Sequence, residues 1–246
     1  MASSASPAGH AFARVDLVQH NELPHVLEVE MIEPTLYLYS KYTIPTAQSE
    51  PIGIASSRKE IWFTEQAANK IGRLNPVTGR ISEYTIPTSS SSPTQIAQGS
   101  DGAMWFTEQS GNKIGRISGS GTISEFTLPG QNSQPWGITK GARDRALWFT
   151  EWGTGKIARI TRRGVITEYQ ASTTNLSDIA ESGDGTFWFA ETNCCKLGRI
   201  SAKGVIREHT IRNPHYPESP VGVVVGPGGS VWYADFRNNE IGSYVP

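Results

Sequence analysis

Cysteines, long apolar runs and an excess of either charge are all scarce in this sequence. Its two cysteines, Cys194 and Cys195, are adjacent, which is a poor placement for a structural disulfide and matches no zinc-binding spacing. The longest apolar runs have the length of a strand, which excludes a membrane-spanning helix. Residues 1–15 contain no apolar segment of the kind that a secretory signal requires. We therefore expect a cytoplasmic protein with reduced thiols.

The charges nearly balance, with a formal net charge of −1 and an isoelectric point of about 6.5. Such a balance gives no sign of a nucleic acid or an anionic membrane as partner, and we expect a small-molecule partner instead. Only 37% of the residues are hydrophobic, whereas 25 glycines and 15 prolines interrupt the chain often. Short strands joined by frequent turns, in one all-β domain, fit this length and composition.

What the sequence does have is one repeated block centred on a tryptophan. The first copy reads Ile-Trp-Phe-Thr-Glu at 61–65, Lys-Ile-Gly-Arg at 70–73 and Ile-Ser-Glu-Tyr-Thr-Ile-Pro at 81–87. The five tryptophans, spaced by 43, 43, 40 and 44 residues, are Trp62, Trp105, Trp148, Trp188 and Trp232. A period of about 40–45 residues predicts an all-β propeller in which each repeat forms one four-stranded blade. We expect all five tryptophans to be buried between blades.

Counting strands suggests how the ring closes. The last repeat ends at Tyr244 without a fourth strand, while residues 40–45 (Ser-Lys-Tyr-Thr-Ile-Pro) match a fourth strand and follow no first three. Pairing that N-terminal strand with the last blade completes five blades and removes both exposed edges. The prediction is a five-bladed propeller over residues 36–246 preceded by an arm, residues 1–35. The alternative is a degenerate sixth blade built from residues 11–35.

Charged residues recur at fixed places in the repeat. Each third strand carries an arginine and each fourth strand a glutamate, as in Arg73 and Glu83. We expect these residues to pair across the two strands on a solvated face of the sheet, with little effect on stability.

The motifs Trp-Phe-Thr-Glu, Asn-Lys-Ile-Gly-Arg-Ile, Glu-Tyr-Thr-Ile-Pro and Pro-x-Gly-Ile together resemble those of the streptogramin lyase (virginiamycin B lyase-like) family, over about residues 36–246. The resemblance implies a propeller that opens a cyclic depsipeptide antibiotic at its ester by elimination, with a bound Mg²⁺. Such chemistry needs a base that removes the proton α to the carbonyl, and a cation or donors that stabilise the developing charge. The family's namesake has seven blades, two more than are predicted here.

The resemblance also implies which residues would act. The family's catalytic histidines occupy the x of Pro-x-Gly-Ile, and a glutamate precedes one such proline. Glu50 matches that glutamate. The x positions contain no histidine; they are Ile52, Thr94, Trp136, Ser177 and Val221. Acids are therefore present at the matching positions, but the matching base is absent.

A second set of acids follows the second strand of each blade, near another glutamate of the family's site. Its members are Glu65, Glu108, Glu151, Glu191 and Asp235. Equivalent positions in a propeller ring the central channel, so these carboxylates would hold Mg²⁺ or Ca²⁺ if they converged. The alternative is that each accepts backbone N–H bonds within its own turn. We predict metal ligands at Glu65, Glu108, Glu191 and Asp235, and a catalytic role for Glu151 with Glu50.

Two residues depart from the repeat within one blade. Trp136 occupies an x position, and Trp152 follows Glu151 directly. They would form an aromatic wall beside Glu151, and aromatic walls with a few polar groups are typical of small-molecule sites. The alternative is that Trp136 only fills the axis of the ring. Thr94 and Asp178 are further ligand-binding candidates, although Asp178 fits a local turn-capping role equally well.

Histidines elsewhere are candidate replacements for the missing base. His25 lies in the N-terminal arm, in Glu-Leu-Pro-His, and His215 lies in the longest connection between blades, residues 212–219. A surface position without a role is the alternative for both.

Two functions remain open. One is an elimination or cyclisation enzyme acting on a small cyclic or polyketide/peptide natural product. The other is a non-catalytic ligand-binding or scaffolding propeller, since a fold alone does not fix function. A lactonase-type propeller with a central Ca²⁺ is a third reading, supported by the acids alone.

Overall fold

The computed structural model describes residues 25–32, 35–211 and 218–246, and these residues form an all-β protein. Its helical content in the described part is one short 3-10 turn, Pro227–Gly229. No helix in that part is long and apolar enough to cross a membrane. The predicted fold class is confirmed.

The repeats fold into antiparallel sheets, each built from consecutive strands, which we call blades 1 to 5. Blade 1 comprises β3 (Pro51–Ser57), β4 (Glu60–Glu65), β5 (Lys70–Leu74) and β6 (Ile81–Thr85). Blade 2 comprises β7 (Pro93–Gln98), β8 (Met104–Glu108), β9 (Lys113–Ile117) and β10 (Ile123–Thr127). Blade 3 comprises β11 (Pro135–Lys140), β12 (Leu147–Glu151), β13 (Lys156–Ile160) and β14 (Ile166–Gln170). Blade 4 comprises β15 (Leu176–Glu181), β16 (Thr186–Glu191), β17 (Lys196–Ser201) and β18 (Ile206–Thr210). Blade 5 comprises β19 (Pro220–Val225), β20 (Val231–Asp235) and β21 (Glu240–Tyr244).

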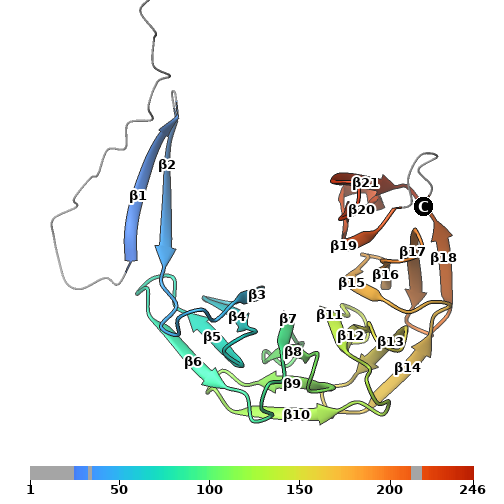
Figure 1. The fold of residues 1–246 in the computed structure, drawn as a ribbon, viewed down its shortest axis with the longest axis horizontal. Coiled ribbons are helices and arrows are strands. Elements are labelled where there is room, and N and C mark those ends of the chain that lie inside the picture. Colours follow the sequence, from blue (N-terminus) through green and yellow to red (C-terminus); the bar gives the residue numbers. More distant parts are fainter. Residues whose placement is uncertain (1–24, 33–34, 212–217) are drawn as a thin grey trace, which may run out of the picture.

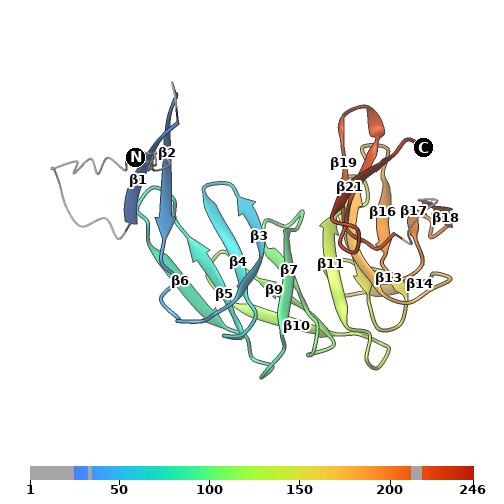
Figure 2. The same cartoon turned by 45° about the horizontal axis from the view of Figure 1, so that its top comes forward.

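The blades follow one another along an open arc, with blades 1 and 5 at its two ends (Figure 1). The first strands β3, β7, β11 and β19 lie along the inside of the arc (Figure 2). We call the side on which the second strands end the turn face. The opposite side, formed by the hairpins that join the first to the second and the third to the fourth strand of each blade, is the hairpin face.

The predicted ring closure is wrong. Residues 40–42 belong to β2 (Thr35–Tyr42), which pairs with β1 (His25–Ile32) in a separate two-stranded sheet. Blade 5 has three strands in the described part of the chain. The physical reason is that packing between neighbouring blades fixes the rotation from each blade to the next. With these rotations the blades form an open arc, and β2 lies across its opening from β21 (Figure 1).

The alternative of a sixth blade would need four strands near the N-terminus, and β1 and β2 form a two-stranded sheet. Residues 15–18, which would supply another strand, lie outside the described residues. The expected boundary between arm and propeller, at residues 35 and 36, falls at the start of β2.

The core consists of layers between blades, each centred on a tryptophan. Trp62, Trp105, Trp148 and Trp188 are at most 2% exposed, and each packs on the following blade. Trp148, for example, stacks on Phe187 of blade 4 with ring centroids 4.6 Å apart. Burial of such large rings is the main stabilising contribution of the repeat. The prediction of a tryptophan core is confirmed at these four positions.

The two ends of the arc expose the surfaces that are buried between inner blades. At one end Trp232 is 42% exposed and Ile241 70% exposed, so the prediction of a buried tryptophan is wrong at position 232. At the other end Ile54 is 71% exposed, although its equivalents Ile96 and Ile138 are almost fully buried. Both faces are open because no described blade packs on them.

The predicted pairing of arginine with glutamate is also wrong. Glu83 lies opposite Gly72, and Arg73 lies opposite Ser82. Because neighbouring residues of a strand point to opposite faces, Arg73 and Glu83 are on different sides of the sheet. Glu83 pairs with Lys70 instead (3.3 Å), whereas Arg73 lies over the ring of Trp62. The same lysine–glutamate pairing recurs in the next three blades, as Lys113–Glu125, Lys156–Glu168 and Lys196–Glu208.

Candidate ligand-binding site

Trp136 and Trp152 come together on the turn face of blade 3. Trp136 follows Pro135 at the start of β11, and Trp152 follows Glu151 at the end of β12. Pro135 and Glu151 are partners in the sheet, so the two indoles are neighbours. Their ring centroids are 5.9 Å apart with the planes inclined by 40°, and both side chains are half-buried. The two indoles are therefore in contact, as expected from the sequence, and together they form what we call the wall.

Hydroxyl groups of the repeat fix the backbone of this wall. The register of β11 against β12 shifts between Pro135 and Ile138, so Trp136 has no partner residue in β12. Its carbonyl oxygen accepts a hydrogen bond from Thr107 Oγ1 of blade 2 at 2.7 Å. Thr94 is fully buried and bonds to the same Thr107 hydroxyl, so it acts on the wall through Thr107 and the Trp136 backbone rather than by touching a ligand.

The same kind of hydrogen bond links each blade to the next along the inside of the arc. A hydroxyl of one blade donates to the carbonyl oxygen of the x residue of the following blade, for example Thr64 to Thr94 (2.7 Å) and Ser177 to Val221 (2.7 Å). No role was predicted for the threonine of Trp-Phe-Thr-Glu, although its repetition at Thr64, Thr107 and Thr150 was a signal in the sequence. These threonines position the residues that line the inside of the arc.

Glu151 lies behind the wall as a buried acid. Its side chain is fully buried, and its Oε2 accepts a hydrogen bond from Thr154 Oγ1 at 2.5 Å. Its Oε1 has no hydrogen-bond partner among the described residues. Burial raises the pKa of Glu151, and the nearby Glu168 carboxylate raises it further. Glu151 therefore ionises less readily than an exposed glutamate.

The equivalent acids of the other blades divide into two kinds. Glu65, Glu108 and Glu191 are fully buried. Burial is the main cause that raises the pKa of Glu65 to about 7 and that of Glu108 to about 8. Asp235 differs: burial alone would raise its pKa, but hydrogen bonds from Asn238 and from the backbone amides of its turn lower it. The turn-capping alternative thus holds for Asp235 and not for the glutamates.

These acids do not form the predicted cation site. In the described part of the chain no three His, Cys, Asp or Glu residues come close enough together to hold a metal ion. The physical reason is the direction of the side chains. Glu65 and Glu108 lie beside Glu83 and Glu125, on the fourth strands of their own blades, rather than converging inside the arc. The predicted Mg²⁺ therefore does not fit the residues that are described, and we assign it no step.

The remaining candidates are Glu50, Asp178, His215 and His25. Glu50 is exposed, adopts a left-handed backbone conformation (φ 52°), and its carbonyl oxygen accepts from the Gln66 amide. Asp178 accepts hydrogen bonds from the amides of Ile179 and, across to blade 5, of Val223, so it fastens blades 4 and 5 together. His215 lies outside the described residues, and His25 lies in β1 with no described side chain.

The buried glutamates make stability depend on pH. The pKa of Glu108 is raised from 4.5 to about 8 in the folded chain, so folding favours the protonated form. Its contribution is fully present below pH 4.5, declines as the unfolded chain ionises, and is lost as pH rises through about 8. Glu108→Gln, which cannot ionise, is expected to have a melting temperature that falls less than the wild type between pH 5 and 8.5. Parallel slopes of melting temperature against pH would contradict this.

Comparisons with known proteins agree with the fold. The sequence profile of the virginiamycin B lyase family matches residues 37–244. A streptogramin B lyase structure is 34% identical, with a TM-score of 0.78 over 90% of this chain and 72% of that one. A catalytically inactive virginiamycin B lyase from Staphylococcus aureus, solved with quinupristin, is 37% identical, with a TM-score of 0.77 over 90% and 73%.

More distant likeness concerns the fold alone. A structure described as a putative gluconolactonase is 15% identical, with a TM-score of 0.62. No curated protein matches the sequence. From the repeat, the blades and the match over residues 37–244, this chain belongs to the virginiamycin B lyase family.

Proposed function

We propose that this chain binds a small cyclic or polyketide/peptide natural product against the wall formed by Trp136 and Trp152. The observation that carries the proposal is the pair itself: two half-buried indoles, with ring centroids 5.9 Å apart, at positions where blade 3 departs from the repeat. Packing alone would be served by the smaller side chains found at these positions in other blades. Large aromatic faces left partly open are typical of surfaces that bind a ligand.

Family membership supports the class of ligand. A relative with 37% identity was solved with quinupristin, so a cyclic peptide antibiotic is the natural first probe for this chain. Glu151 is fully buried behind the wall, so it would support the two tryptophans from within the blade and would not contact the bound ligand.

Elimination or cyclisation of the ligand is the second candidate function, and family membership favours it. It requires a base, and the x positions supply none, since they hold Ile52, Thr94, Trp136, Ser177 and Val221. A base would have to come from elsewhere in the chain, with His215 and His25 the proposed sources. Without one, the protein is a non-catalytic binding member of the family.

Titration calorimetry with quinupristin tests the binding site. Trp136→Ala and Trp152→Ala are each expected to weaken binding by about three- to tenfold, since an aromatic contact contributes about 0.5–1.5 kcal/mol beyond area burial. Trp232→Ala is the matched control, because Trp232 is also partly exposed but lies at the end of the arc. All three variants should melt close to the wild type. Unchanged affinity in both blade 3 variants would place the ligand elsewhere.

A further inference from the structure

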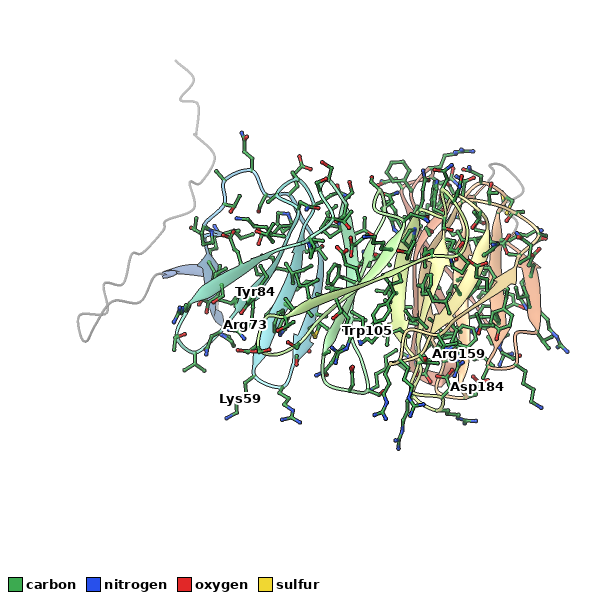
Figure 3. The ribbon with its side chains drawn as sticks, turned by 90° about the horizontal axis from the view of Figure 1, so that it is seen from below. Lys59, Arg73, Tyr84, Trp105, Arg159 and Asp184 are labelled. Carbon is green, nitrogen blue, oxygen red and sulfur yellow. The ribbon has the colours of Figure 1, made fainter. Side chains whose placement is uncertain are left out.

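The hairpin face carries an excess of basic side chains. Nine exposed arginines and lysines lie in its hairpins or at their edges: Arg58, Lys59, Arg80, Lys140, Arg143, Arg145, Arg162, Arg163 and Lys203. In the described structure none of them has an ion-pair partner. Lys59 lies at the lower edge of the molecule in Figure 3, where nitrogen-tipped side chains project from the hairpins.

Four of the five acids of this face are already paired with arginines. Glu60, Asp101, Asp144 and Asp184 each pair with an arginine of a third strand, as in Asp144 with Arg159 at 2.7 Å. Glu181, at the end of β15, is half-buried. The nine unpaired cations and the four paired arginines make thirteen basic side chains, against these five acids. The whole-chain net charge of −1 conceals this separation, because the compensating acids lie toward the turn face and near the N-terminus.

Exposed valines accompany the cations. Val77, Val165 and Val205 are 79%, 60% and 58% exposed, and all three lie in hairpins between third and fourth strands. Arg163 is two residues before Val165, and Lys203 is two residues before Val205. Apolar tips beside flexible cations suit the boundary between headgroups and acyl chains, where the tips enter and the cations contact anionic headgroups.

We propose that the hairpin face docks on an anionic lipid membrane. Cations spread over blades 1, 3 and 4 would contact many headgroups at once, and the valine tips would insert between them. A nucleic acid fits less well, because the described hairpins carry no aromatic residue on which bases would stack. Docking in this way leaves the turn face, with Trp136 and Trp152, directed away from the membrane. The surface is thus independent of the proposed ligand site.

Co-sedimentation with vesicles tests the proposal. The full chain is expected to bind vesicles of phosphatidylcholine and phosphatidylserine at least about tenfold more tightly than vesicles of phosphatidylcholine alone, and added salt should weaken this binding. Arg163→Glu should reduce binding several-fold. Arg237→Glu, which changes the net charge equally but follows β20 on the turn face, should leave it nearly unchanged.

The valine tips have their own matched control. Val205→Ser should weaken binding to the mixed vesicles, whereas Val224→Ser should not, although both valines are 58% exposed. Equal binding to both kinds of vesicle, or equal loss in Arg163→Glu and Arg237→Glu, would overturn the proposal. So would binding to duplex DNA at equal strength together with no effect of Val205→Ser, because the surface would then recognise polyanions in general.

Discussion

Replacing Trp148 by alanine is expected to lower the free energy of unfolding by about 3–5 kcal/mol, the usual cost of removing a fully buried aromatic ring. Trp148 is 0% exposed and stacks on Phe187 and Tyr169, with centroids 4.6 and 5.7 Å away. Its indole Nε1–H also donates to Asp144 at 3.0 Å. The variant would leave a large void between blades 3 and 4 and remove one hydrogen bond to Asp144, which would keep those from Arg159 and Ala146.

Trp232→Ala provides the control for that prediction, since the same residue type occupies the same place in the repeat. Trp232 is 42% exposed, so its loss removes far less buried surface and should cost clearly less than Trp148→Ala. Urea denaturation followed by circular dichroism measures both variants, with the free energy of unfolding extrapolated to water. Equal losses would mean that Trp232 is covered by something in solution.

Linearisation of quinupristin by this chain is expected to be about 10²–10⁴-fold slower than by a family lyase that has its catalytic histidines, because a general base contributes about that factor. The position that matches the family's base holds no histidine in any of the five repeats. Within the described side chains, His209 is the one histidine, and it packs between Trp188 and Tyr244. Elimination leaves the mass unchanged, so the linear product must be separated by chromatography.

Fast linearisation would contradict that expectation and would point to a base at another position. His215→Ala and His25→Ala then separate the two proposed sources, with His209→Ala as the control for a half-buried histidine packed between aromatic rings. Binding measured in parallel distinguishes an inactive protein from one that does not bind the antibiotic.

The strands were predictable because the first three recur in five blades and the fourth in four. Ile-Trp-Phe-Thr-Glu became β4, and Asn69 and Asn112 adopt the left-handed turns expected of asparagine (φ 55° and 53°). Closure was not predictable in this way, because it depends on the angles between blades, and these are set by packing over the whole arc. The partner of Arg73 was misassigned by one residue of register, which moves a side chain to the other face of the sheet.

The candidate site shows the same limit. Trp136 and Trp152 stood out because they depart from their repeat, and adjacency in the sheet followed from the hairpin. The acids stood out because they agree with the repeat, but equivalent positions say nothing of the direction in which a side chain points. Glu65 and Glu108 turn toward the fourth strands of their own blades, where burial raises the pKa of each.

The open ends have a consequence for how the molecule comes apart. Blades 2, 3 and 4 each pack on two neighbours, whereas blades 1 and 5 pack on one described blade each. In a linear array with contacts between neighbours only, units at the ends open with the least free energy. Backbone amides of β20 and β21 should therefore exchange hydrogen sooner than those of β12 and β13. Blade 3 is separated from either end of the arc by two interfaces between blades. The strands that carry Trp136 and Trp152 should therefore be among the last to unfold locally.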